Sequence, residues 1–232
     1  MFETLLSINY EPFILSFKLA ALTSLILFII TLPLAWYLSQ TSSKTKPFFE
    51  ALTALPLVLP PSVLGFYLLI AFSYDSPIGA FFEETFGIKL LFSFTGLVVA
   101  SCFYSLPFML QPLQSGFESI NKNMLEASYI AGKSKLHTIF RIALPNMKPA
   151  LLTALIVTFA HTVGEFGVVL MVGGSIPSET KVASVAIYEM VELMDYTTAH
   201  IYSGLMLLMS FIVLLSVYLF NAKHNRKFGF NR

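Results

Sequence analysis

The chain of 232 residues is 56% hydrophobic and only 12% charged, against about 25% charged residues in an ordinary soluble domain. Its 14 basic and 13 acidic residues are too few to cover the surface of a soluble protein of this length, so the composition predicts a membrane protein. A formal net charge of +1 argues against a nucleic-acid partner, and the single cysteine excludes a disulfide framework and a cysteine metal cluster.

Five apolar stretches are long enough to cross the hydrocarbon core as helices, which takes about 20 residues. In chain order they cover 13–38, 48–73, 92–113, 148–171 and 198–220. The first stretch has no basic region before it, unlike a cleavable signal peptide, and we expect it to be a permanent span. Because no soluble domain or internal repeat is evident, we expect residues 1–232 to form one transmembrane domain.

The basic residues fall mainly on one side of these spans. The connection 39–47, the loop 114–147 together with the adjoining Lys148, and the tail after 220 hold two, five and four of the 14 Lys and Arg residues. The positive-inside rule assigns these segments to the cytoplasm. We therefore expect a multi-pass protein of the cell inner membrane, with its N-terminus outside and its C-terminus in the cytoplasm.

Two prolines stand near the middle of the second span. Pro60 and Pro61 free backbone carbonyls that hydrocarbon cannot satisfy, so the helix must bend or break there and face protein or water. A hinge that lines a pathway and a static kink packed against a neighbour both fit this pattern. We count Pro60, Pro61 and Gly65 as candidate pathway or gating residues.

The segment "EASYIAGKS", residues 126–134, ends like a phosphate-binding loop. Ala127 stands where such a loop needs its first glycine, and the preceding residues have helical rather than strand periodicity, so we do not expect an ATP site. We expect two cytoplasmic helices instead. Asn123 and Glu126 have capping-box spacing, and Gly132 suits the end of the first helix.

In the same loop, Ser134 suits the start of a second helix that runs through Arg141 and ends at Pro145. Spacing alone leaves open the alternative of a basic amphipathic helix that rests on lipid.

Glu165 is the only carboxylate deep in a span, where an ionised group needs a partner or water. Lys18 lies at a similar depth, about 10 Å toward the outside compared with about 7 Å for Glu165. We hypothesise an intramembrane pair of Lys18 and Glu165. The alternative is that Lys18 extends to the outer headgroups while Glu165 binds backbone or water. Gly164 and Gly167 either loosen the span or permit close helix packing.

After the fourth span, the residues that follow Pro177 predict a short amphipathic helix outside the membrane. It either caps the pathway or lies on lipid. The four histidines are scattered and form no recognisable metal site.

The loop motif resembles a known pattern. It consists of "EAS", three residues, a glycine, nine residues and "IALP". This spacing is similar to that of the EAA loop in membrane subunits of ABC importers, E-A-A-x3-G-x9-I-x-L-P. The second alanine is replaced by a serine of similar size. The resemblance implies a coupling helix that docks on a separate ATPase subunit. It assigns this role to Glu126, Ala127, Ser128, Gly132, Ile142, Leu144 and Pro145.

Three further segments, "LSFKLA", "LPLVLPPSVLGFYLL" and "VGEFGVVLMVGGSIPSETKVASVAIY", resemble permeases of molybdate importers. Sulfate importers are similar and carry a related Gly-Glu-aromatic-Gly stretch. The resemblance implies the all-α fold of type I ABC importer permeases, with five transmembrane helices. It also implies transport of molybdate or tungstate, with sulfate or thiosulfate as the alternative substrate. It adds Gly164, Glu165, Phe166 and Gly167 to the pathway candidates.

The resemblance also implies partners. We expect a homodimer of permease copies in the lipid bilayer, two ATPase subunits that bind ATP and Mg²⁺, and an external oxyanion-binding protein. The chain itself is expected to bind no cofactor and to catalyse no reaction. Two rivals belong to other classes: a channel or carrier that needs no ATPase, and a membrane enzyme. The sequence offers the enzyme no nucleophile with a base and no paired carboxylates within a span.

Overall fold

A computed structural model describes residues 9–227, and every regular element in this part is helical. The predicted all-α class is therefore confirmed. In chain order the elements are α2 (Glu11–Gln40), α3 (Lys46–Val58), α4 (Pro61–Phe72), α5 (Pro77–Phe86), α6 (Phe94–Glu118), α7 (Lys122–Ile130), α8 (Lys135–Thr138), the π-helix η1 (Ile139–Ala143), α9 (Leu144–Asn146), α10 (Lys148–Gly164), α11 (Gly167–Gly173), α12 (Ala183–Glu192) and α13 (Tyr196–Lys227).

Three helices are individually long and apolar enough to cross a membrane: α2, α6 and the part of α13 from Tyr196 to Ser216. Two more candidates exist only if a bent helix pair counts as one span. These are α3 with α4, bent by 109°, and the segment 135–146 with α10, bent by 80°. The described residues thus contain three to five candidate spans, and the predicted five is the upper value.

The predicted stretches 48–73 and 148–171 are not continuous helices. α3 ends at Val58 and α4 begins at Pro61, because a proline lacks the N–H of the helical ladder and disfavours helical geometry in the residue before it. α10 ends at Gly164, and α11 begins only at Gly167. The proline pair therefore breaks the helix as predicted, and the fourth span is broken as well.

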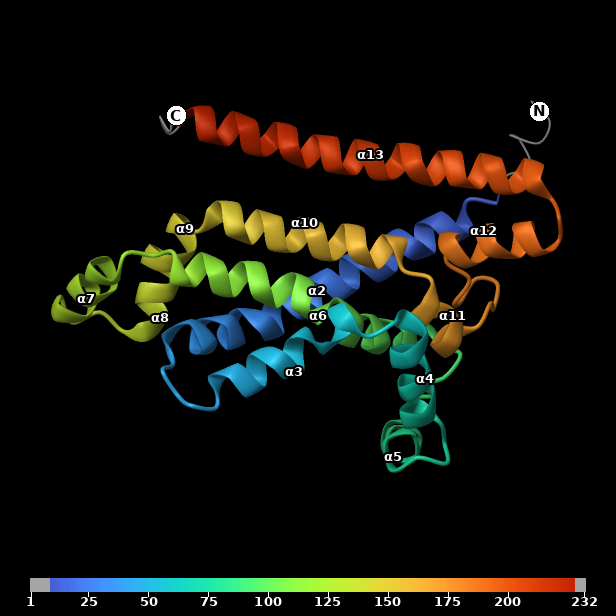
Figure 1. Cartoon of the computed structure of the whole chain (residues 1–232), viewed down its shortest axis with the longest axis horizontal. Helices are drawn as coiled ribbons and strands as arrows, with labels where there is room; N and C mark the ends of the chain where they lie inside the picture. Colours follow the sequence, from blue (N-terminus) through green and yellow to red (C-terminus); the bar gives the residue numbers. More distant parts are fainter. Residues whose placement is uncertain (1–8, 228–232) are drawn as a thin grey trace.

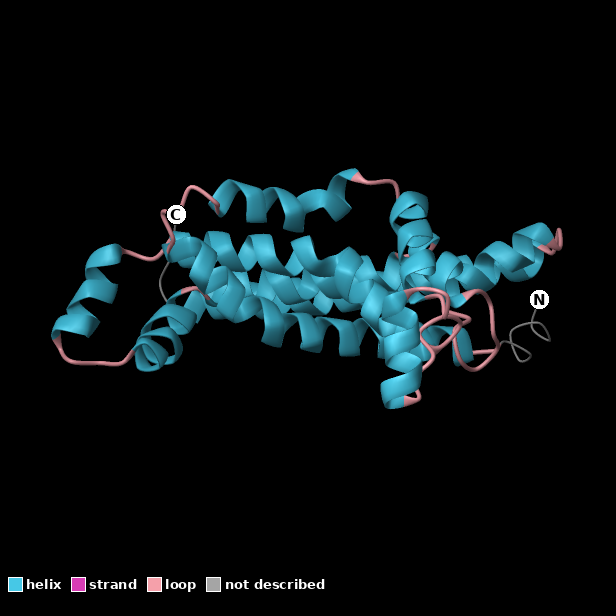
Figure 2. Ribbon diagram, turned by 90° about the horizontal axis from the view of Figure 1, so that it is seen from below, coloured by secondary structure: helices cyan, strands magenta, loops and turns pink. Residues whose placement is uncertain are grey.

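The centre of the bundle is formed by α2, α6 and α10, which lie side by side (Figures 1 and 2). The largest buried cluster lies where these helices meet and includes Leu27, Leu38, Met109, Leu113 and Phe117. α13 runs along one edge of the bundle in Figure 1, and only 11% of its apolar window is buried within this chain. Such a surface is suited to face lipid or another apolar helix.

The two ends of the bundle differ (Figure 1). α7 and α8 project at one end, beside the connection between α2 and α3. α5, α11 and α12 lie toward the other end, where the N-terminal part of α2 also lies. The sequence assigned one group of residues to ATPase coupling and another to the pathway. These two groups therefore lie apart along the length of the bundle.

Candidate functional site

The EAA-like motif folds into the helix pair α7 and α8. Asn121 caps α7, because its side-chain oxygen accepts a 2.9 Å hydrogen bond from the backbone nitrogen of Asn123. The predicted capping box of Asn123 and Glu126 is therefore wrong, since the cap lies two residues earlier. Glu126 and Ala127 are exposed on α7, while Ser128 is buried.

Gly132 turns the chain between the two helices, as predicted. Its φ of +72° lies in the left-handed region that glycine adopts without steric cost, and its nitrogen donates to the Tyr129 carbonyl at 2.9 Å. Ser134 caps α8 by accepting a hydrogen bond from the nitrogen of His137. The prediction that Pro145 ends this segment is wrong. Pro145 lies in the first turn of α9, which continues to Asn146, and a proline is tolerated there.

Apolar side chains of α7, α8 and the following η1 are exposed. Ile130, Leu136 and Phe140 are 87%, 67% and 58% exposed. By contrast, Leu144 packs against the central cluster, and Ile142 is half-buried. The motif thus combines an anchor in the bundle with an apolar outer surface, which is the arrangement of an interaction site.

Ser128, the one departure from the EAA pattern, links α7 to α8. Its hydroxyl lies 2.8 Å from that of Thr138, and both side chains are buried. Thr138 also donates to the carbonyl of Ser134 at 3.1 Å. Because Thr138 donates its hydroxyl proton to this carbonyl, Ser128 is the donor between the two hydroxyls. This hydrogen bond explains structurally why a serine occupies the position where the EAA pattern has alanine.

We expect Ser128→Ala to lower the free energy of unfolding by about 1 kcal/mol or less, because Thr138 keeps its bond to the Ser134 carbonyl. Thr138→Val should cost about 1–3 kcal/mol, because it removes both bonds and leaves the buried Ser128 hydroxyl without its partner. Thermal denaturation of the detergent-solubilised protein compares the two variants. Equal losses would contradict this description of the hydroxyl pair.

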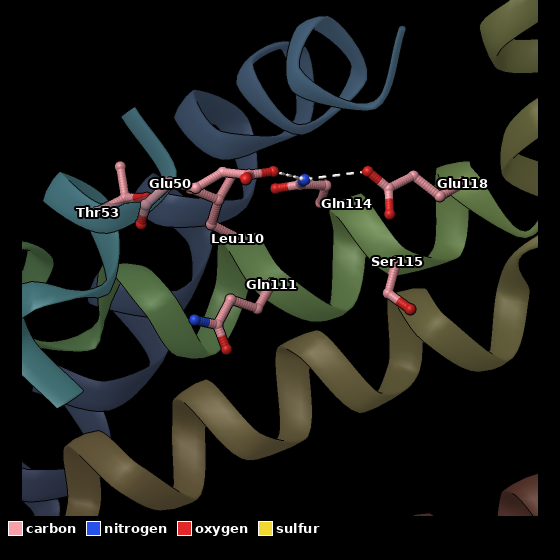
Figure 3. Close-up of a pocket in the computed structure, with 7 residues that line it drawn as sticks. All are labelled: Glu50, Thr53, Leu110, Gln111, Gln114, Ser115 and Glu118. Carbon is pink, nitrogen blue, oxygen red and sulfur yellow. Dashed lines mark hydrogen bonds between the residues drawn. The ribbon is translucent and has the colours of Figure 1, made fainter. Parts of the chain in front are cut away.

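A polar cavity of about 220 Å³ lies between α3 and α6 (Figure 3). The Nε2 atom of Gln114 lies 2.6 Å from Oε1 of Glu50 and 3.1 Å from Oε1 of Glu118. Lys46 adds ion pairs of 3.0 Å to Glu118 and 3.6 Å to Glu50. None of the 13 residues of α3 is buried, and this polar network joins the helix to α6.

Gln114→Leu is expected to destabilise the solubilised protein by about 1 kcal/mol, because two carboxylates then lose their shared amide donor. The value lies at the low end for charged acceptors because Glu118 is partly exposed and solvent screens it. Gln111→Leu is the matched control, since Gln111 lines the same cavity but is drawn without a hydrogen bond to the other lining residues (Figure 3). Equal shifts of the melting temperature would argue against the network.

The two broken spans meet at their breaks. A Cβ atom on Gly167 would lie 2.8 Å from Cβ of Pro61, and one on Gly65 would lie 2.9 Å from Cβ of Met171. Both distances are too short for a real Cβ, so these glycines permit α4 and α11 to approach closely. A Cβ on Gly164 would meet nothing within 4 Å. Of the two glycines around Glu165, only Gly167 therefore serves close packing.

Glu165 lies in the break between α10 and α11 and is 5% exposed. Its carboxylate accepts a 2.7 Å hydrogen bond from the nitrogen of Val168, in the first turn of α11. Its backbone carbonyl accepts a 2.6 Å hydrogen bond from the hydroxyl of Ser184 on α12. The buried carboxylate is thus held by backbone, which is the alternative that the sequence left open.

The hypothesised pair of Lys18 and Glu165 is not formed. The Nζ atom of Lys18 lies 4.7 Å from the centroid of the Phe94 ring, which is a cation–π distance. No ion pair within residues 9–227 joins Lys18 to Glu165. Phe166, the other break residue, packs against Tyr188 of α12 with ring centroids 4.9 Å apart.

The helix predicted after Pro177 is present as α12, and its position outside the membrane stays a prediction. The hydroxyl of Tyr188 donates to Oε1 of Glu192 at 2.7 Å, and this hydrogen bond to a carboxylate raises the pKa of Tyr188. Sequence reasoning missed Ser184 and Tyr188 as partners of the break. In the sequence, only the amphipathic pattern of this segment pointed to these two residues. Such a pattern indicates a helix but does not indicate which groups its polar side chains contact.

His161 of α10 packs against two rings of α6, with centroids 4.3 Å from Tyr104 and 3.6 Å from Phe108. Among the residues that the structure describes, no group of three or more His, Cys, Asp or Glu side chains could hold a metal ion.

Comparison with known proteins finds a family and relatives that match most of the chain. The sequence model of the family described as "Binding-protein-dependent transport system inner membrane component" matches residues 20–226. The molybdenum transport system permease protein ModB of Azotobacter vinelandii is 48% identical over 205 residues, which is 88% of this chain and 90% of the relative. The probable sulfate transport system permease protein cysT of Chlorella vulgaris is 32% identical over 203 residues, 88% of this chain and 74% of the relative.

Among solved structures, the fold is similar to a chain in the crystal structure of a bacterial ABC transporter involved in the import of the acidic polysaccharide alginate. The TM-score is 0.76, and the match covers 97% of this chain and 82% of that chain. At 18% sequence identity, this likeness concerns the fold alone.

Proposed function

Since the chain belongs to the binding-protein-dependent transport system inner membrane component family, we propose that it is the membrane-spanning permease of an ATP-driven importer that carries molybdate or tungstate into the cytoplasm. The substrate assignment rests on the 48% sequence identity to ModB across 88% of the chain, compared with 32% identity to the cysT sulfate relative of Chlorella vulgaris. Sulfate or thiosulfate is the alternative that the experiment below tests.

We assign energy coupling to α7, α8 and η1. Their exposed Ile130, Leu136 and Phe140 support a partner that covers this end of the bundle. The partner is an ATPase subunit that binds ATP and Mg²⁺, because residues 126–145 follow the EAA-like pattern and this end exposes an apolar surface. Glu126 and Ala127 lie on the exposed side of α7, and Gly132 sets the angle between the docking helices.

The proposed orientation places the α7–α8 end in the cytoplasm and the α12 end outside, in keeping with the basic residues of the loop 114–147 and the positive-inside rule. The external partner is a binding protein, in keeping with the words of the family description, and with the proposed substrate it binds an oxyanion. A second copy of the chain completes the pathway. The apolar side chains that α3 exposes, Phe48, Phe49, Leu52, Leu55 and Val58, support a further protein surface against this helix.

In this proposal, transport proceeds by alternating access. Closure of the ATPase pair on ATP moves the two coupling helix pairs together and opens the pathway to the outside, and release of the hydrolysis products reopens it to the cytoplasm. The breaks at Pro60–Pro61 and Glu165–Phe166 are the points at which the spans change direction. They are the proposed gate.

Uptake of labelled molybdate in cells that lack their own importer tests the substrate. The cells carry this chain with its binding protein and ATPase, and excess sulfate is added as competitor. Uptake that resists sulfate supports molybdate. Uptake abolished by sulfate would move the chain to sulfate transport. Absence of uptake of labelled molybdate, and of labelled sulfate in a parallel assay, would overturn the proposal.

A further inference from the structure

The external helix α12 contacts the break of the fourth span at two points. The Ser184 hydroxyl donates to the Glu165 carbonyl at 2.6 Å, and the Tyr188 ring packs on Phe166 with centroids 4.9 Å apart. Tyr188 is also 40% exposed. One side chain of α12 therefore reaches from the outer surface of the molecule to a residue of the break.

The hydrogen bond from Ser184 satisfies a carbonyl at an interrupted helix. α10 ends at Gly164, and Glu165 has an extended backbone conformation and is buried. A buried carbonyl outside regular structure needs a donor, and leaving it without one is costly. Ser184 is that donor, so the conformation of the break depends on a side chain of another element.

α12 itself is firmly seated on the bundle. The nitrogen of Ala183 donates to the Ser16 hydroxyl of α2 at 2.9 Å, and Val185 and Ala186 are buried. The following loop leads directly into α13. Because a packed helix moves as a unit, a partner that shifts α12 shifts both Ser184 and Tyr188.

We propose that Ser184 and Tyr188 are positioning residues that couple α12 to the Glu165–Phe166 break. An external protein that contacts α12 thereby acts on the gate. The proposal rests on the proposed function, in which this protein is the oxyanion-binding protein. Docking is communicated to the gate through one hydrogen bond and one ring contact, both within this chain.

The first test measures ATP hydrolysis by the reconstituted transporter, with its ATPase subunits, as a function of the concentration of molybdate-loaded binding protein. Ser184→Ala should lower the maximal stimulated rate about fivefold, the size of one net hydrogen bond, and leave the half-saturating concentration unchanged. Ser184→Thr keeps a hydroxyl and should retain most of the stimulation. Ser203→Ala, at an exposed serine of α13, should behave as the native chain.

The ring contact gives a second, independent pair of variants. Tyr188→Ala removes the packing on Phe166 and should lower the maximal stimulated rate, whereas Tyr188→Phe keeps the ring and loses only the bond to Glu192. If Tyr188→Phe lost as much stimulation as Tyr188→Ala, the loss would come from the hydroxyl and not from the ring contact, and the role given to that contact would be overturned. If Ser184→Ala raised the half-saturating concentration alone, α12 would be a docking contact without coupling, and the proposal would be overturned.

A third measurement needs the permease alone and so separates this proposal from the proposed substrate. Val163→Cys places a thiol at a buried position, 4% exposed, one residue before the end of α10, in a chain whose native cysteine is removed by Cys102→Ser. Adding Ser184→Ala should raise the rate of thiol labelling about fivefold, because the break opens more often. Equal labelling rates with and without Ser184→Ala would overturn the coupling. If molybdate-loaded binding protein failed to stimulate ATP hydrolysis by the native transporter, only the proposed function would be overturned.

Discussion

Gly132→Asp is expected to reduce molybdate uptake by about tenfold or more, which corresponds to about 1.4 kcal/mol of lost coupling. Gly132 has a φ of +72°, where any side chain adds backbone strain. A Cβ there would meet nothing within 4 Å in this chain, so the substitution causes no clash within the permease. The loss arises from the altered turn between α7 and α8, and from a carboxylate placed beside the apolar docking surface.

Gly87→Asp is the matched control. Gly87 has a φ of +66°, has equally open space around a Cβ, and ends α5 toward the opposite end of the bundle. The strain is therefore similar but is remote from the ATPase. Co-purification of the ATPase subunit with each variant, together with uptake, compares the two. If both substitutions reduced uptake and assembly equally, the effect of Gly132→Asp would be general destabilisation and not coupling.

Gly167→Ala is expected to destabilise the solubilised permease by about 1–3 kcal/mol, the usual cost of overpacking, and to reduce uptake severalfold. Its Cβ would lie 2.8 Å from Cβ of Pro61, and the proline ring cannot rotate away. α4 and α11 must therefore separate at the point where the two broken spans meet.

Gly164→Ala tests whether the loss of stability and uptake comes from the close contact of Gly167 with Pro61 or from the Gly-Glu-Phe-Gly stretch as a whole. Gly164 is in the same Gly-Glu-Phe-Gly stretch, but its Cβ would occupy open space, so both stability and uptake should stay near native values. Melting temperature and uptake are measured for both variants. A loss for Gly164→Ala as large as that for Gly167→Ala would mean that flexibility of the stretch, not close packing, is what matters.

The features that sequence reasoning predicted correctly are local ones. The left-handed turn at Gly132, the cap at Ser134 and the break at Pro60–Pro61 each follow from the conformational preferences of a few adjacent residues. The wrong cap at Asn123 is a local error of two residues, since Asn121 offers the same side chain. Helix boundaries are less certain than helix existence for this reason.

The features that sequence reasoning missed depend on how separate helices face one another. Counting the rise per residue placed Lys18 and Glu165 at similar depth but gave no rotation about the helix axes, and the structure turns Lys18 toward Phe94. The contact of Gly167 with Pro61 and the bond from Ser184 to Glu165 join residues far apart in the chain. Periodicity within one segment carries no information about such pairs.

The most direct test of the transport assignment is uptake of labelled molybdate by vesicles that contain the purified permease, its ATPase and its binding protein, with ATP or without it. We predict accumulation that requires ATP and the binding protein and that persists in excess sulfate. Entry of molybdate at the same rate without ATP or without the ATPase subunit would instead identify a channel or carrier and would contradict the coupling role of α7 and α8.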